Sequence, residues 1–103
     1  MTKLFLIMEN NGDTYNYCYP RTNYHCFIHS IYSNKKKAEK ICLELNKKCS
    51  SINLLPDKDE IFQEIDKITD YKKKMDWIEE QSCEVDDQSR ILYYYITENE
   101  LIN

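Results

Sequence analysis

The chain has 103 residues and a formal net charge of −4, with 42% hydrophobic and 31% charged residues. That length suits one domain over residues 1–103, and the apolar content excludes a disordered chain. No apolar run approaches the ~20 residues that cross a bilayer, and one Gly and two Pro exclude glycine-rich phosphate loops and turn-dense sandwiches.

A β-hairpin is expected near the N-terminus. Residues 3–9 form an apolar run rich in β-formers, which is too short for a signal peptide. The dipeptide Asn11-Gly12 follows, and both residue types accept the positive φ angles of a tight turn. We therefore expect a second strand over residues 14–19.

Tyrosines alternate along this second strand. Tyr15, Tyr17 and Tyr19 fall on one face, because successive side chains in a strand point to opposite sides. Exposed tyrosines are frequent interface anchors, since they bury a large area and keep a hydroxyl donor. The same tyrosines could instead fill the core and its rim, or stack on a nucleobase.

A third strand is expected over residues 25–32, followed by the strongest helix pattern of the chain at residues 34–48. Ser33 has the side chain of a favourable N-cap. Apolar side chains then recur at the spacings of one helical face, and they are Ala38, Ile41, Cys42, Leu45 and Cys49. We expect this face, including its two thiols, to pack in the core.

Three lysines occupy the first turn of this helix. The helix dipole disfavours cations such as Lys35, Lys36 and Lys37 at that end, so local stability does not explain them. N–H groups at a helix start accept anions, so these lysines with Arg21 could capture a nucleotide or another phosphate ligand. A solvated lysine run is the simpler interpretation, and both stay open.

A second helix is expected from about residue 57 to residue 80. Asp57 and Glu60 have the spacing of a capping box, and a break is expected near Thr69-Asp70. Apolar residues recur along one side of this helix, and charged residues occupy the other.

Residues 57–87 contain twelve acidic side chains. If the exposed ones project together, they could steer the chain toward a basic groove of a nuclease or polymerase. A solvated helix with ion pairs four residues apart is the alternative. We assign a partner-binding surface to the strand tyrosines and to five of the acids, which are Asp66, Asp70, Asp76, Glu79 and Glu80.

The last predicted strand covers residues 90–97. It is apolar or aromatic on both faces, which is typical of a strand paired on both sides. The tail after this strand is expected to add a short edge segment or turn. These elements predict an α+β fold with a three- to four-stranded, mainly antiparallel sheet, an N-terminal β-hairpin and two helices.

The cysteines and histidines form no recognisable catalytic or metal-binding motif. Zinc-ligating atoms occur at Cys18, His25, Cys26 and His29, but the spacing lacks the paired ligands of a structural zinc site. A Cys26 nucleophile would lack an identified acid and oxyanion hole. We therefore expect no enzyme activity, no metal and no cofactor. Five cysteines without a secretory signal predict reduced thiols, no disulfide and a cytoplasmic location.

One combination of elements is shared with a known group of proteins. An N-terminal strand, the Tyr32-Ser33 cap, a charged helix with Ala38 and Leu45, and a last strand over 95–101 together resemble small uncharacterised domains of phages and prophages. The resemblance covers roughly half of the chain and implies a compact domain of hairpin, helix and sheet. It assigns no catalytic residue, and it implies a protein that binds and blocks a host factor.

We expect an accessory protein of a phage or mobile element that inhibits a host protein stoichiometrically. A nuclease or another effector of host defence would be such a partner, as for an anti-CRISPR protein. Residues 1–49 carry eight Lys and Arg against four acids, whereas residues 50–103 carry six against fourteen. Duplex DNA binding is disfavoured, because it usually rests on a basic domain. A homodimer that buries the same tyrosines is a further alternative.

Overall fold

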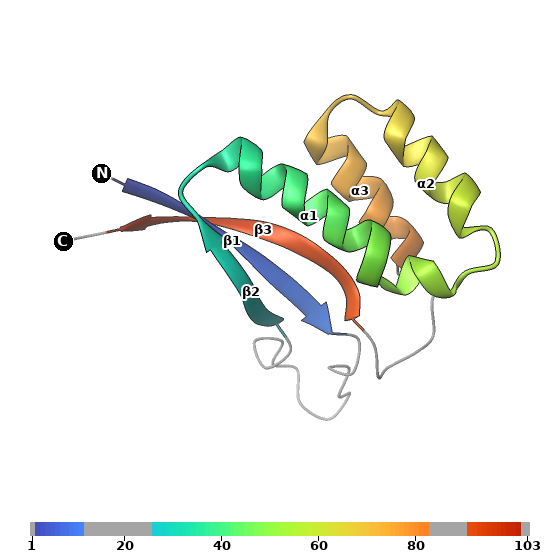
Figure 1. The fold of residues 1–103 in the computed structure, drawn as a ribbon, viewed down its shortest axis with the longest axis horizontal. Coiled ribbons are helices and arrows are strands. Elements are labelled where there is room, and N and C mark those ends of the chain that lie inside the picture. The colour runs from blue at the N-terminus through green and yellow to red at the C-terminus, as the bar shows by residue number, and fades with distance from the viewer. Residues whose placement is uncertain (1, 12–25, 83–90, 102–103) are drawn as a thin grey trace.

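The computed structural model describes residues 2–11, 26–82 and 91–101 (Figure 1). Within these ranges the chain forms one antiparallel sheet and three α-helices, which confirms the predicted α+β class. In chain order the elements are β1 (Thr2–Asn11), β2 (Cys26–Tyr32), α1 (Lys35–Cys49), the short 3-10 helix η3 (Ser51–Leu54), α2 (Lys58–Lys67), α3 (Tyr71–Ser82) and β3 (Ile91–Leu101).

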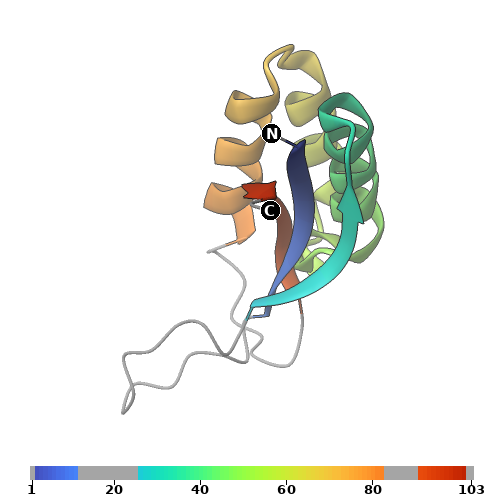
Figure 2. The ribbon, with the colours of Figure 1, turned by 90° about the vertical axis from the view of Figure 1, so that its left-hand side faces the viewer.

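β1 lies at the centre of the sheet, between β2 and β3 (Figure 2). Both partners run antiparallel to it, and Ile7 is opposite Ser30 on one side and Ile96 on the other. The expectation of a central last strand is therefore wrong. β3 is an edge strand, and it is apolar on both faces because helices as well as β1 pack against it. β3 also continues to Leu101, so the tail extends the strand.

The predicted second strand and its three tyrosines lie outside the described residues, and so do Cys18, Arg21 and His25. Inside the described ranges, β2 matches the predicted third strand closely. It pairs directly with β1, with an irregularity of register next to Ile7.

The start of α1 differs from expectation by one residue. Asn34 caps the helix instead of Ser33, since the Asn34 Oδ1 accepts a hydrogen bond of 3.0 Å from the Lys37 N–H. Both residue types are good N-caps, and the one that precedes the first helical residue directly takes the position.

The predicted break in the second helix is confirmed. α2 ends at Lys67, and the Asp70 carboxylate accepts a hydrogen bond of 3.1 Å from the Lys73 N–H in the first turn of α3. The predicted capping box at the start of α2 is wrong. Asp57 does precede the helix, but its side chain makes no capping hydrogen bond.

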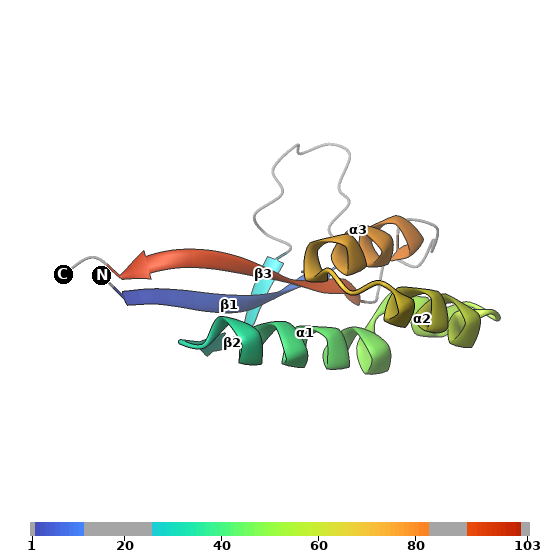
Figure 3. The ribbon, with the colours of Figure 1, turned by 90° about the horizontal axis from the view of Figure 1, so that it is seen from above.

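The core lies between the sheet and the helices. Seen from above, α1 and α3 lie on opposite sides of β3, and α2 packs beside them (Figure 3). Eight buried residues form the core, and they are Ile7, Cys42, Ile52, Ile61, Ile65, Met75, Ile78 and Tyr94. Cys42 is buried as expected, but Cys49, the last residue of α1, is exposed because the packed face ends before it.

One buried side chain forms hydrogen bonds with backbone groups on the outer edge of β3. Asn46 of α1 donates from its Nδ2 to the Tyr94 carbonyl oxygen at 3.1 Å, and its Oδ1 accepts from the Tyr94 N–H at 2.8 Å. The Ser51 Oγ donates to the Leu92 carbonyl oxygen at 3.0 Å. A primary amide has the same donor and acceptor as a peptide bond. Along residues 92–94, α1 and η3 therefore take the place of a fourth strand.

Candidate binding groove beside β3

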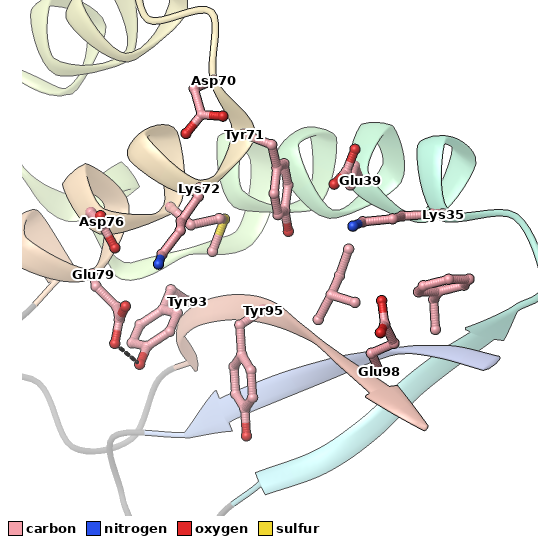
Figure 4. A pocket seen from close by; sticks show the side chains of 13 residues that line it. Lys35, Glu39, Asp70, Tyr71, Lys72, Asp76, Glu79, Tyr93, Tyr95 and Glu98 are labelled. Carbon is pink, nitrogen blue, oxygen red and sulfur yellow. Dashed lines mark hydrogen bonds between the residues drawn. The ribbon is translucent and has the colours of Figure 1, made fainter. Parts of the chain in front are cut away.

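A groove of about 600 Å³ lies between α1, α3 and β3 (Figure 4). Ligand pockets commonly have volumes of roughly 300–1,000 Å³. The strand contributes Tyr93, Tyr95, Ile96 and Glu98, which come from both of its faces. The groove therefore wraps around the strand edge, and we call it the β3 groove.

Acidic side chains outnumber basic ones around the β3 groove. Five carboxylates line it against two lysines, which leaves an excess of three negative charges. The carboxylates are Glu39, Asp70, Asp76, Glu79 and Glu98, and the lysines are Lys35 and Lys72. All seven except Glu39 are exposed. A hollow lined mainly by one sign of charge concentrates the field and attracts groups of the opposite sign.

Aromatic rings form the apolar wall of the groove. The rings of Tyr93 and Tyr95 lie with their centroids 5.9 Å apart on one face of β3. The Tyr93 Oη donates a hydrogen bond of 2.9 Å to Glu79 Oε1, which joins β3 to α3 (Figure 4). Phe5 lines the opposite side of the groove, on the face of the sheet toward α1. Such a wall suits a ligand with aliphatic or cationic side chains.

Tyr71 reaches from the start of α3 into the groove (Figure 4). Its hydroxyl is buried and faces the Cys42 thiol, without a hydrogen bond of regular geometry in the described part of the chain. Burial, and then the neighbouring Cys42, raise the pKa of Tyr71 above its ordinary value near 10. Burial also raises the pKa of Cys42 to about 11, so this thiol is protonated at neutral pH and is a poor nucleophile.

Beyond Tyr94 the outer edge of β3 is open. Backbone groups of alternate residues point to the same side of a strand, so the N–H and C=O of Ile96 and Glu98 point outward like those of Tyr94. No hydrogen bond joins these outward groups to another described residue. Ile96 and Glu98 also line the groove. The β3 groove therefore combines negative charge with backbone donors and acceptors that no described residue pairs with.

Comparisons with known proteins leave the chain without an assigned family. No protein-family model, curated protein or solved structure matches it. What the β3 groove binds must therefore follow from its geometry and its charge.

The structure brings together three of the five acids that the sequence singles out. Asp70, Asp76 and Glu79 all line the β3 groove, because α3 presents one side to the edge of β3. Glu80 is exposed on α3 and does not line it. Asp66 lies on α2, where its Oδ2 pairs with the Lys47 Nζ at 2.8 Å beside a smaller cavity of about 190 Å³.

The three lysines at the start of α1 do not share one environment. Lys35 lines the β3 groove and extends toward the Tyr71 hydroxyl (Figure 4). Lys36 is exposed, and the Lys37 Nζ lies 5.9 Å from the centre of the Tyr32 ring. Phosphate capture by these lysines stays a prediction, and Arg21 lies outside the described residues.

The residues considered for metal binding are only partly described. His29 is exposed, and its ring makes an edge contact with the Tyr94 ring at 5.6 Å. Across 2–11, 26–82 and 91–101, no three His, Cys, Asp or Glu side chains are placed to share a metal ion. None of the helices in those ranges is long and apolar enough to span a membrane.

Sequence reasoning missed the residues that shape the groove from inside. Asn46 closes the inner end of the strand edge, and Tyr71 fills the space between α1 and α3. A signal for Asn46 was present, because it lies four residues after Cys42 and continues the apolar face of the helix. A polar side chain in such a face predicts a buried hydrogen-bonding partner.

Proposed function

We propose that the chain inhibits a host protein stoichiometrically by presenting the β3 groove to a basic surface of that protein. One observation supports this proposal most. Five carboxylates and a strand edge with unused backbone groups border the same 600 Å³ hollow. Charged groups arranged in this way select a partner of opposite charge and speed its association.

A nuclease or another nucleic-acid-binding effector of host defence fits this partner class. Such proteins expose lysine and arginine where they contact phosphates. An acidic ligand that occupies those side chains competes with the nucleic acid for the same surface. The proposed role is therefore that of a phage or mobile-element protein that blocks a defence effector, as an anti-CRISPR protein does.

Two double variants with equal changes in net charge test the proposal. Asp76→Asn/Glu98→Gln removes two carboxylates of the β3 groove, whereas Glu60→Gln/Glu80→Gln removes two exposed carboxylates that do not line it. Each chain is immobilised, and the host proteins captured at 50 and 300 mM salt are quantified by mass spectrometry. Candidate partners are then assayed for nucleic-acid binding with increasing amounts of the chain.

We expect a nucleic-acid-binding protein that is retained by the original chain and by the control variant. The groove variant should capture at least tenfold less of it, and higher salt should weaken capture because exposed charges are screened. Inhibition should be complete near one molecule of the chain per molecule of partner. Equal capture of the same proteins by all three chains would contradict the proposal.

A further inference from the structure

We propose that the partner binds as an added strand: an extended, basic segment pairs with the outer edge of β3 from Ile96 to Glu98, inside the β3 groove. This inference rests on the proposed function and specifies how the groove recognises its partner. It differs from a purely electrostatic contact, because it requires backbone hydrogen bonds between the partner and β3.

The two parts of the β3 edge support strand addition. Next to Tyr94, the Asn46 amide supplies one donor and one acceptor to the strand, as a neighbouring strand would. Ile96 and Glu98 each have an N–H and a C=O on the same outer side. No described residue forms a hydrogen bond with these groups. An open sheet edge offers a template for another chain to pair with. The partner segment would continue the pairing that Asn46 begins.

The space beside the edge fits an added strand. Neighbouring strands lie about 4.8 Å apart, and side chains of the added strand alternate between the two sides of the sheet. On one side they would meet Tyr93 and Tyr95, and on the other they would meet Phe5 and Lys35. α1 and α3 flank β3 on these two sides (Figure 3). Alternate side chains of the partner would therefore occupy different walls of one groove.

Charge determines which occupant fits. A second copy that paired antiparallel about Glu98 would set this carboxylate opposite its own counterpart, and like charges directly opposite in a sheet are destabilising. A lysine- or arginine-bearing segment instead gains attraction from the three excess negative charges of the groove, which arise from five acids and two lysines. Glu98 also has Lys3 within 3.3 Å, and this exposed pair can exchange for a pair with the incoming segment.

The other unpartnered surfaces identify no occupant. β2 exposes Phe27, Ile28 and Ile31, each by about half of its surface, but neither described cavity borders them. Leu4 and Leu6 lie beside Ile28 and Ile31 on the face of the sheet opposite Ile7, whereas Phe27 is opposite Glu9 on the face of Ile7. Nothing in their charge or geometry favours one partner over another.

A synthetic peptide tests the inference directly. The probe is an eight-residue peptide that alternates arginine and valine, and its affinity for the full chain is measured by titration calorimetry. Two isomers carry backbone N-methyl groups, one on the arginine amides and one on the valine amides. In an added strand only alternate N–H groups face the neighbouring strand. We expect one isomer to lose affinity by on the order of tenfold or more and the other to keep it.

A pair of variants at one position provides the matched control. Glu98→Gln removes the charge, whereas Glu98→Pro removes the charge and the outward N–H while leaving the ladder to β1 in place. We expect the proline variant to bind the peptide at least tenfold more weakly than the glutamine variant. Circular dichroism establishes that both variants keep the fold.

The outcomes separate this inference from the proposed function. If both methylated isomers bind as tightly as the parent peptide and Asp76→Asn/Glu98→Gln abolishes binding, strand addition is wrong and the acidic groove still serves as the binding surface. Absence of any peptide binding at 1 mM also overturns strand addition. The capture experiment with the two double variants decides the proposed function independently of both results.

Discussion

The two halves of the outer edge of β3 lie in opposite environments. In the first half, Asn46 forms hydrogen bonds with the N–H and C=O of Tyr94, and Ser51 donates one to the Leu92 carbonyl oxygen. α1 and η3 pack against this part of the strand. In the second half, Ile96 and Glu98 line the β3 groove instead. The first half is part of the core, whereas the second half borders the groove and has no hydrogen-bond partner on its outer side among the described residues.

Under the proposal above, one part of β3 is protected by the core while another part of the same strand binds the partner. If helices covered the whole outer edge of β3, no partner could pair with it. If the whole edge were exposed, it could pair unspecifically with other chains and cause aggregation. One buried amide protects the half nearer the core. The excess of negative charge at the other half disfavours pairing between copies of the chain and favours a basic partner.

The largest expected effect on stability comes from removing the side-chain hydrogen bonds of Asn46 to β3. Asn46→Leu removes both hydrogen bonds to Tyr94 and leaves its N–H and C=O buried without partners. We expect the free energy of unfolding to fall by about 3 kcal/mol, because each unsatisfied buried group costs roughly 1–3 kcal/mol. Urea unfolding measures this. Asn99→Ala, on the exposed part of the same strand, serves as the control and should change stability by less than about 0.5 kcal/mol.

Asn46→Asp makes the same hydrogen bonds sensitive to pH. A protonated aspartic acid can still donate to the Tyr94 carbonyl oxygen, whereas the carboxylate cannot. Burial raises the pKa of such a group in the folded protein above its unfolded value of about 3.9. The variant should therefore be closest to the original chain in stability below pH 4 and should lose stability as pH rises. A deficit that is the same at pH 4 and pH 7 would contradict this role of Asn46.

The second effect concerns Cys42, a buried thiol of α1 that lies beside Tyr71 in the core. Burial raises its pKa from an ordinary value near 9 to about 11, so the protonated thiol is favoured by folding. This contribution is complete below pH 9 and is lost as pH rises through 11. Urea unfolding at pH 8, 9.5 and 11 should show a flatter profile for Cys42→Ala.

A smaller effect is expected at the inner wall of the groove. Tyr71→Phe removes a buried hydroxyl that has no regular hydrogen bond among the described residues. Stability should stay the same or rise by up to about 1 kcal/mol, because an unsatisfied hydroxyl is costly to bury. A loss of more than 1 kcal/mol in urea unfolding would show that the contact with Cys42 acts as a strong hydrogen bond.

The smallest effect on stability is expected at an ion pair that lies outside the outer edge of β3 and its groove. The ion pair between Lys47 and Asp66 is about half exposed, although its atoms lie 2.8 Å apart. Asp66→Asn should lower the free energy of unfolding by less than about 1 kcal/mol and leave peptide binding to the β3 groove unchanged. A tenfold loss of peptide affinity would instead extend the binding surface to α2.

Local patterns in the sequence predicted several elements well. The apolar spacing around Cys42 predicted α1, and the polar dipeptide at residues 69–70 predicted the end of α2. These features depend on residues close together in the chain. The position of β3 at the sheet edge was not predictable in this way, since strand order depends on pairing with β1, about ninety residues earlier.

The candidate site was predictable only in part, for the same reason. The acidic run predicted Asp76 and Glu79 on one helix, and α3 does place both at the groove, with Asp70 directly before the helix. The outward backbone groups of Ile96 have no sequence signal, because they become a site only when β3 is an edge strand. Asn46 had a signal in its polar side chain on an apolar face, but its partner Tyr94 lies 48 residues away.

Amide hydrogen exchange of three β3 residues, alone and with the arginine-valine peptide, tests the central claim most directly. In the protein alone, the Tyr94 amide should exchange slowly because Asn46 holds it, and the Ile96 and Glu98 amides should exchange fast. Saturating peptide should slow Ile96 and Glu98 at least tenfold and leave Tyr94 unchanged. Exchange at Ile96 and Glu98 that is already as slow as at Tyr94, or that the peptide does not alter, would contradict the claim.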